Sequence, residues 1–166
     1  MRPGTICLLP ALLVLGGAIL PDTAGAQTNH SYVLLTANSD TAIFLDSTTL
    51  AQNGDQVTAW SVWVYYPSKT IPAIGSAAYI VFQDTYDCKA RKSKTNYSAD
   101  YQADGTLLYS TPNKQEFRPV VPDTLGDVTM TNACGAWTTL NANPFPDISS
   151  AVGTARTVMA GGDKKN

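Results

Sequence analysis

Apolar and polar residues alternate along the middle of the chain with the period of two that is typical of β-strands. The clearest segment is 56–66, "QVTAWSVWVYY", in which successive side chains point to opposite faces. Trp60 and Val62 share one face. Val57 and Trp63 share the other face. Because both faces carry large apolar side chains, we expect this strand to be central in a sheet, with both faces at least partly covered.

Other segments show a strand pattern as well, and the composition favours strands. We expect them at residues 32–36, 42–46, 77–95, 97–103 and 106–111. The central strand is expected to end at Pro67. Gly54 and Gly105 each lie in a short polar segment that is typical of hairpin turns. Glutamate occurs once, at Glu116, whereas threonine and tyrosine are abundant, which favours strands over helices.

A short helix is predicted just before the last cysteine. Asp123 can cap a helix that runs towards Cys134, with Leu125 and Val128 on its apolar side. Gly126 and nearby threonines lower the intrinsic stability of this helix. We therefore expect it to depend on contact with the sheet.

The tail, residues 135–166, is rich in alanine, threonine, asparagine, glycine and proline. Ile148, Val152, Ala155 and Met159 recur at helical spacing, and Asp147 or Ser149 could cap such a helix. A single short amphipathic helix is marginal in water. We therefore predict a mostly disordered tail with a short transient helix.

The first 26 residues have the pattern of a secretory signal peptide. Arg2 provides a positive start, residues 6–20 are almost continuously apolar, and the small residues 24–26 suit cleavage after Ala26. The apolar run is shorter than the roughly 20 residues of a spanning helix. No cysteine follows the small residues, so we predict no lipid anchor there, and no later segment is apolar enough to span a membrane. The protein is therefore expected in the periplasm or secreted.

Removal of residues 1–26 leaves 140 of the 166 residues and two of the three cysteines. Because disulfides persist in exported proteins, this even number predicts a Cys88–Cys134 bridge. Two thiols and the lone His30 cannot fill the four positions of a zinc site, and we expect neither metal nor other cofactor. His30 lies close to the new N-terminus, where mobility is expected.

Four motifs occur in a fixed order between Tyr32 and Cys134: "TANSDTAIFLDSTTL", "QVTAWSVWVYY", "TYDCKARKS" and "EFRPVVPDTLGDVTMTNAC". Together they resemble the bacterial surface-adhesin protein E-like domain family. The resemblance implies an α+β fold, a roughly six-stranded antiparallel sheet with a C-terminal helix tethered to it by a disulfide. It places Cys88 in the sheet and Cys134 in the helix. The expected organisation is a signal peptide at 1–26, this domain at 27–134 and the tail at 135–166.

Two groups of residues are candidates for a binding surface. Lys89, Arg91, Lys92 and Lys94 follow Cys88 closely. They suit either a solvated strand end that resists aggregation or a patch for an anion or glycan. A reactive thiol would need access and a low pKa, which a buried disulfide removes.

Trp60 and Trp63 form the second group. Packing in the core or on a sheet face is one reading, because strands bury aromatic residues at this spacing. An exposed platform for a protein, a lipid or a haem-like ligand is another. A homodimer interface is a third.

The sequence contains no pattern of catalytic residues. Asp84 and Asp87 lie on opposite faces of a strand and make a poor acid–base pair. No phosphate-binding loop or metalloprotease motif occurs. A net charge of −2 gives no general attraction to nucleic acid.

We therefore expect a non-enzymatic, exported binding module with an unknown protein partner. By resemblance, that partner is a host or envelope protein. The alternatives are a structural or envelope-stress protein without a dedicated ligand, and a carrier of a small haem-like ligand. An apolar patch on the sheet face away from the helix would favour binding, whereas a uniformly polar face would favour the structural role.

Overall fold

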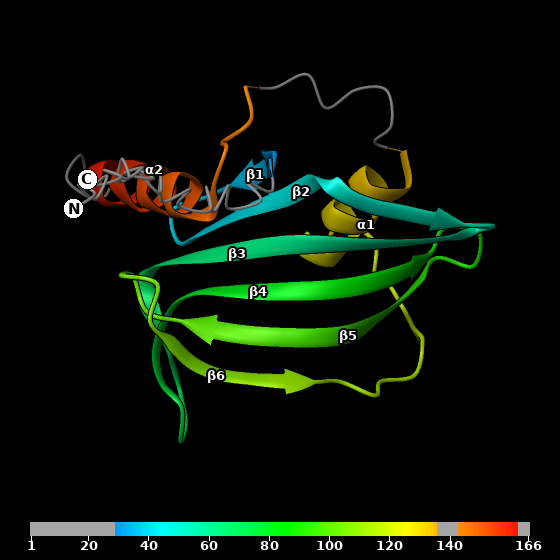
Figure 1. Cartoon of the computed structure of the whole chain (residues 1–166), viewed down its shortest axis with the longest axis horizontal. Coiled ribbons are helices and arrows are strands. Elements are labelled where there is room, and N and C mark those ends of the chain that lie inside the picture. The colour runs from blue at the N-terminus through cyan, green and yellow to red at the C-terminus, as the bar shows by residue number, and fades with distance from the viewer. Residues whose placement is uncertain (1–28, 136–142, 163–166) are drawn as a thin grey trace, which may run out of the picture.

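An antiparallel meander forms the body of the molecule. The computed structural model describes residues 29–135 and 143–162 (Figure 1), so the predicted signal peptide lies outside the described residues. Six strands follow one another across the sheet: β1 (Tyr32–Ala37), β2 (Thr41–Asn53), β3 (Gln56–Ile71), β4 (Gly75–Asp87), β5 (Lys92–Tyr101) and β6 (Leu107–Pro112). A seventh, β7 (Arg118–Pro119), pairs with β5. Two helices, α1 (Leu125–Gly135) and α2 (Ile148–Gly162), complete the α+β fold, which confirms the predicted sheet with a helix tethered to it.

Several of the predicted strand boundaries are wrong. The strand expected at 42–46 continues to Asn53. The expected strand at 77–95 is in fact β4 and the first residues of β5, joined by a turn that begins at Cys88, and β5 continues into the strand expected at 97–103. Asp87 Oδ1 accepts a hydrogen bond from the Ala90 amide at 2.8 Å, and Arg91 adopts a φ of 52°, so the chain reverses. The central strand does not end at Pro67 but continues to Ile71, because the ladder resumes after a register shift around the proline.

The predicted hairpin turns are confirmed at both glycines. Gly54 has a φ of 60° and Gly105 a φ of 88°, a region that other residues rarely adopt. The Asp104 carboxylate also accepts the Thr106 amide at 2.9 Å, which fixes the β5–β6 turn.

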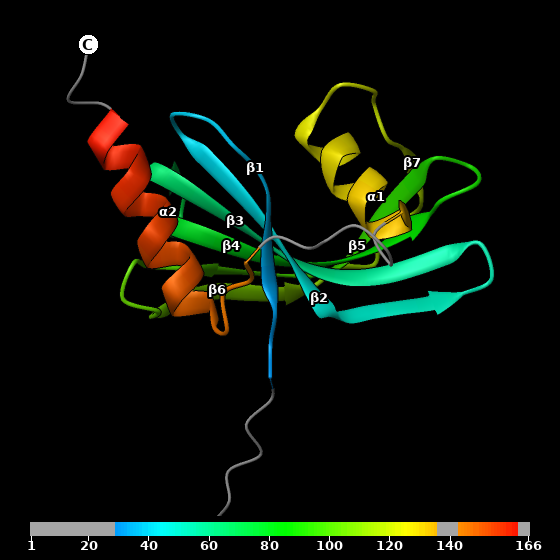
Figure 2. The same cartoon turned by 90° about the horizontal axis from the view of Figure 1, so that it is seen from above.

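β3 buries both of its faces, as its alternation predicted, but under different helices. Val62 lies opposite Phe44 on β2 and Val81 on β4, and this face packs against α2. Val57 lies opposite Tyr86, and this other face packs against α1. Figure 1 and Figure 2 show the two helices at opposite ends of the sheet. Each helix therefore covers one end of one face.

α2 corrects the prediction of a mostly disordered tail for the residues that the structure describes. The apolar residues at helical spacing are buried against the sheet: Ala151, Val152, Ala155 and Met159. Sequence reasoning treated this helix alone, whereas Phe44, Val62 and Val64 provide an apolar surface on which it docks. Residues 136–142 and 163–166 lie outside the described residues.

Polar contacts hold this tail segment at its start and in the middle of α2. Asp147 is the cap, because its carboxylate accepts the Ser150 amide at 2.7 Å. Ahead of the helix, Tyr32 and Phe145 exchange two backbone hydrogen bonds of 2.9 Å, which attaches the segment to the edge strand β1. Within α2, the Arg156 guanidinium donates to the carbonyl of Tyr65 on β3.

α1 is capped by Thr124 rather than by the predicted Asp123. The Asp127 amide donates to Thr124 Oγ1 at 3.3 Å, and the Asp123 amide, one residue before the cap, donates to Asp127 Oδ2 at 3.1 Å. Asp123 itself has a φ of 60° and forms the preceding turn. Thr124, one residue later, therefore has the capping role.

The predicted disulfide is confirmed. Cys88 at the end of β4 and Cys134 in the last turn of α1 are bonded, with 5.7 Å between their Cα atoms and a sequence separation of 46. Arg91 in the same turn forms an ion pair with Asp127 at the start of α1. Both ends of a weak helix are thus held to one turn of the sheet.

Replacing Cys134 by serine is expected to lower the free energy of unfolding by about 4 kcal/mol, because the unfolded chain regains the entropy of an open loop of this length. Denaturant melts of the oxidised protein, with and without dithiothreitol, measure this change. The reductant should destabilise the parent to the level of the variant and leave the variant unchanged. An unchanged parent melt after reduction would contradict the stabilising role.

Replacing Val152 by aspartate is expected to destabilise the protein by about 3 kcal/mol, since it places an unpaired charge in the core under α2. Val158→Asp on the same helix is the matched control, because Val158 is 68 % exposed. Thermal melts of both variants test whether α2 is docked. Equal, small effects would indicate a helix that does not pack on the sheet.

Candidate functional site

Three of the predicted binding residues lie together on one sheet face. Trp60, Gln83 and Tyr97 form a row across β3, β4 and β5. Thr85 faces Lys94 two positions further along β4. Lys92 follows at the end of β5, opposite Asp87. Since these rows are two residues apart along β4, their side chains point to the same face.

A β-bulge brings Tyr97 onto this face. In a regular strand, Lys94 and Tyr97 would point in opposite directions. The register shifts between Gln83 and Asp84, so that Asn96 is the extra residue on β5. Asn96 donates its side-chain amide to Thr85 Oγ1 at 2.8 Å, which holds the bulge in place.

We call this surface the aromatic–lysine patch; its members are Trp60, Lys92, Lys94, Tyr97 and Phe117. The rings of Trp60 and Tyr97 meet edge to face with centroids 5.7 Å apart. Lys94 Nζ lies 5.0 Å from the ring centroid of Phe117 in a cation–π contact. All are partly buried except Lys92, which is exposed.

In the described part of the chain, both helices lie away from the patch. α2 covers the same face, but at Val62 and Val64, towards the other end of β3. α1 packs on the opposite face, against Val57 and Ala59. The patch therefore lies on the face away from the disulfide-tethered helix.

The remaining predicted residues are elsewhere. Trp63 lies on the opposite face, where its ring packs edge to face on Phe82 at 5.8 Å. Its Nε1 atom is buried and has no hydrogen-bond partner among the described residues. Lys89 is exposed in the β4–β5 turn, and Arg91 pairs with Asp127. The structure thus brings only three of the six predicted residues together. Tyr97 and Phe117, which the sequence did not suggest, join those three in the patch.

His30 is held in place, contrary to the mobility expected near the N-terminus. Its Nδ1 atom lies 2.6 Å from Asp46 Oδ2, and its ring stacks on Tyr32. Asp46 is 1 % exposed and also accepts the Thr48 hydroxyl at 2.7 Å. Burial, followed by the charges of Asp46 and Asp147, raises the pKa of Tyr32 to about 12. This polar cluster anchors the start of β1.

Asp84 is a partly buried acidic residue on the face under α1. Burial raises the pKa of Asp84, while hydrogen bonds from Thr95 Oγ1 at 2.7 Å and Tyr86 at 3.3 Å partly oppose that rise. Asp87 points to the other face, as predicted, so the two carboxyls do not form a pair. Among the described residues, no three histidine, cysteine or acidic side chains are grouped to hold a metal ion.

Comparison with known proteins gives the family. The family model described as Surface-adhesin protein E matches residues 32–135. The chain belongs to this family. Membership implies an exported protein, and no helix in the described ranges is long and apolar enough to cross a membrane. The match ends at the last residue of α1, so α2 lies beyond the matched residues.

Among solved structures, the chain is similar to protein E from non-typeable Haemophilus influenzae. The two sequences are 15 % identical, the match covers 80 % of this chain and 86 % of that chain, and the TM-score is 0.38. No curated protein was found to match the sequence.

Replacing Asp84 by asparagine is expected to raise the melting temperature at neutral pH more than at acid pH. Because folding raises the pKa of the Asp84 carboxyl, its ionisation destabilises the folded protein, and this cost appears as the pH rises towards neutral. Asparagine does not ionise, so the variant avoids this cost. Melts between about pH 3 and pH 7 measure the difference between variant and parent.

Asp127→Asn is the control, and its effect on stability is expected to have the opposite pH dependence. The Asp123 amide, and after it Arg91, hold the pKa of Asp127 below its usual range, so its contribution is lost as the pH falls. If the gain in melting temperature of Asp84→Asn over the parent did not grow from acid to neutral pH, burial of Asp84 would not destabilise the protein as we expect.

Proposed function

We propose that this chain is a non-enzymatic binding module, exported to the periplasm or the cell exterior, that docks a protein partner on the aromatic–lysine patch. The observation that carries the proposal is the position of the patch. Aromatic side chains gather on the sheet face away from α1, where a protein without a dedicated ligand would have a polar surface. Membership of a surface-adhesin family supports a binding role.

The residue types in the patch suit a protein interface. Tryptophan and tyrosine are enriched among the residues that contribute most to binding, because they bury a large area at low conformational cost. Here the rings of Trp60 and Tyr97 restrain one another, so less freedom is lost when a partner covers them. The two rings come from β3 and β5, which pair with β4 on either side, so the sheet fixes their backbones.

The two lysines indicate the charge of the partner. Lys92 is exposed, and Lys94 lies over Phe117 beside the aromatic rings. Lysines at the edge of an apolar patch favour partners with acidic groups at their rim and raise the rate of association. We therefore propose an acidic protein surface, belonging to the envelope or to a host, as the partner.

Photo-crosslinking in cells that export the protein tests this proposal. A benzophenone amino acid replaces Tyr97 in the patch and, as the matched control, Tyr109, which is 47 % exposed on β6. We expect a discrete crosslinked product at position 97 and none of that mass at 109. Mass spectrometry of the product identifies the partner, or a second copy of this chain if the patch is a dimer interface.

Charge reversal provides the second arm. Lys94→Glu is expected to reduce the position-97 product about tenfold, because a like charge then faces an acidic partner. Lys114→Glu, an exposed lysine beyond the patch, should leave the yield unchanged. The absence of any product at position 97, or equal products at 97 and 109, would overturn the proposal in favour of a structural role.

A further inference from the structure

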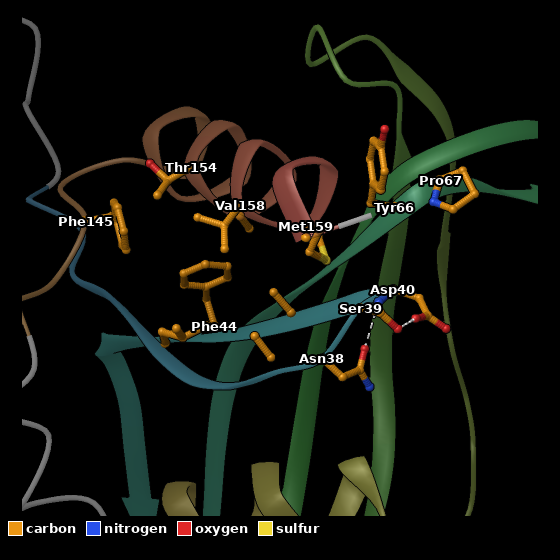
Figure 3. Close-up of a pocket in the computed structure, with 15 residues that line it drawn as sticks. Asn38, Ser39, Asp40, Phe44, Tyr66, Pro67, Phe145, Thr154, Val158 and Met159 are labelled. Atoms are coloured by element: carbon orange, nitrogen blue, oxygen red, sulfur yellow. Dashed lines mark hydrogen bonds between the residues drawn. The ribbon is translucent and has the colours of Figure 1, made fainter. Parts of the chain in front are cut away.

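A cavity lies between α2 and the β1–β2 edge of the sheet, away from the aromatic–lysine patch. The cavity has a volume of about 520 Å³. Its apolar walls come from several elements, and Figure 3 shows Phe44, Tyr66, Phe145, Val158 and Met159 around it. Leu34 of β1 also lines it. We propose that this cavity binds a small, uncharged molecule with an apolar body and a hydrogen-bond donor.

The floor of the cavity is rigid. Phe44 is 1 % exposed and lies in β2, paired with β1 on one side and β3 on the other. The rings of Phe44 and Phe145 meet edge to face at 5.6 Å. Val158 and Met159 of α2 face this floor from the opposite wall (Figure 3). The site is therefore already formed without an occupant, which lowers the cost of binding.

The size of the cavity suits one small molecule. Pockets that enclose drug-sized ligands have volumes of roughly 300–1,000 Å³ and mostly apolar walls. Two apolar side chains on its lining also remain unusually exposed: Leu34 at 45 % and Val158 at 68 %. An occupant between them would remove this apolar surface from water.

The polar residues of the cavity select the chemical class. Asn38, Ser39 and Asp40 form one side of it, at the β1–β2 turn (Figure 3). Asn38 Oδ1 accepts the amides of Asp40 and Thr41 at 3.0 and 2.8 Å, and the Ser39 hydroxyl donates to Asp40. Thr154 and Tyr66 add hydroxyl groups to the lining, but its one charged group among the described residues is the Asp40 carboxylate, which accepts hydrogen bonds and repels anions.

A basic side chain that packs on the lining residue Tyr66 is already engaged. Arg156 of α2 donates to the Tyr65 carbonyl and lies over the ring of Tyr66, 5.5 Å from its centroid. It is not among the lining residues. A fatty acid or a phosphate would therefore meet Asp40 without a compensating cation among the described lining residues. An uncharged ligand with an N–H or O–H group fits better.

Two dyes with the same aromatic skeleton test this inference. N-phenylnaphthylamine is uncharged and has an N–H donor, whereas anilinonaphthalene sulfonate adds a negative charge. Fluorescence titrations of the purified, oxidised protein should show one site for the uncharged dye and at least tenfold weaker binding of the sulfonate. Asp40→Asn should reduce that difference.

Matched substitutions locate the site. Leu34→Asp and Val158→Asp should each weaken binding of the uncharged dye at least tenfold. Leu107→Asp and Val121→Asp, at positions 51 % and 63 % exposed away from the cavity, should not change it. Because all four side chains are exposed, the variants are expected to keep the melting temperature of the parent.

The result that overturns the inference is an uncharged dye that does not bind, or that binds equally well to all four variants. Tighter binding of the sulfonate would overturn the assigned ligand class. Concentration-dependent dimerisation that Leu34→Asp abolishes, without dye uptake, would assign the face to a second copy instead. None of these outcomes depends on crosslinking at position 97, so this inference and the proposed function fail separately.

Discussion

The structure depends on one strand that must be covered on both faces. β3 places Val62 and Val64 on one side and Val57 and Ala59 on the other, and none of the four is more than 2 % exposed. One helix cannot cover both sides of a sheet. The chain solves this with two helices that pack on opposite faces at opposite ends of β3. Most of the surface features follow from this arrangement.

The two covered ends leave room for the two proposed binding sites. Where α1 covers one face, the other face stays open and displays the aromatic–lysine patch. Where α2 covers the second face, it meets the sheet next to the edge strands and encloses a cavity with Phe44 at its floor. The patch lies within the family domain at 32–135, whereas the cavity needs α2, which lies beyond it. The two sites can therefore serve different partners.

The helices are attached by different means because their sequences differ. α1 has two glycines and two threonines, and it is held by the Cys88–Cys134 bond and the Arg91–Asp127 ion pair. α2 has a continuous apolar face and depends on burial of Val152, Ala155 and their neighbours. Loss of the disulfide and loss of apolar contacts should thus affect different ends of the molecule.

The features that depend on short stretches of sequence, or on simple counts, could be predicted from the sequence. Alternation identified β3 as a central strand, Gly54 and Gly105 marked turns, and the cysteine count gave the disulfide. Long-range contacts decided the rest. The Asn96 bulge moves Tyr97 to the patch, and the register that requires this bulge is set by β4. Docking of α2 and the Asp46 contact of His30 likewise depend on partners distant in sequence.

Native-state hydrogen exchange tests the two-sided burial of β3 most directly. If both helices pack on this strand as part of one cooperative unit, the amides of Val152, Ala155 and Met159 in α2 should exchange with an opening free energy close to that of Val62 and Val64 in β3. Near-unprotected exchange throughout α2, alongside slow exchange in β3, would contradict the account.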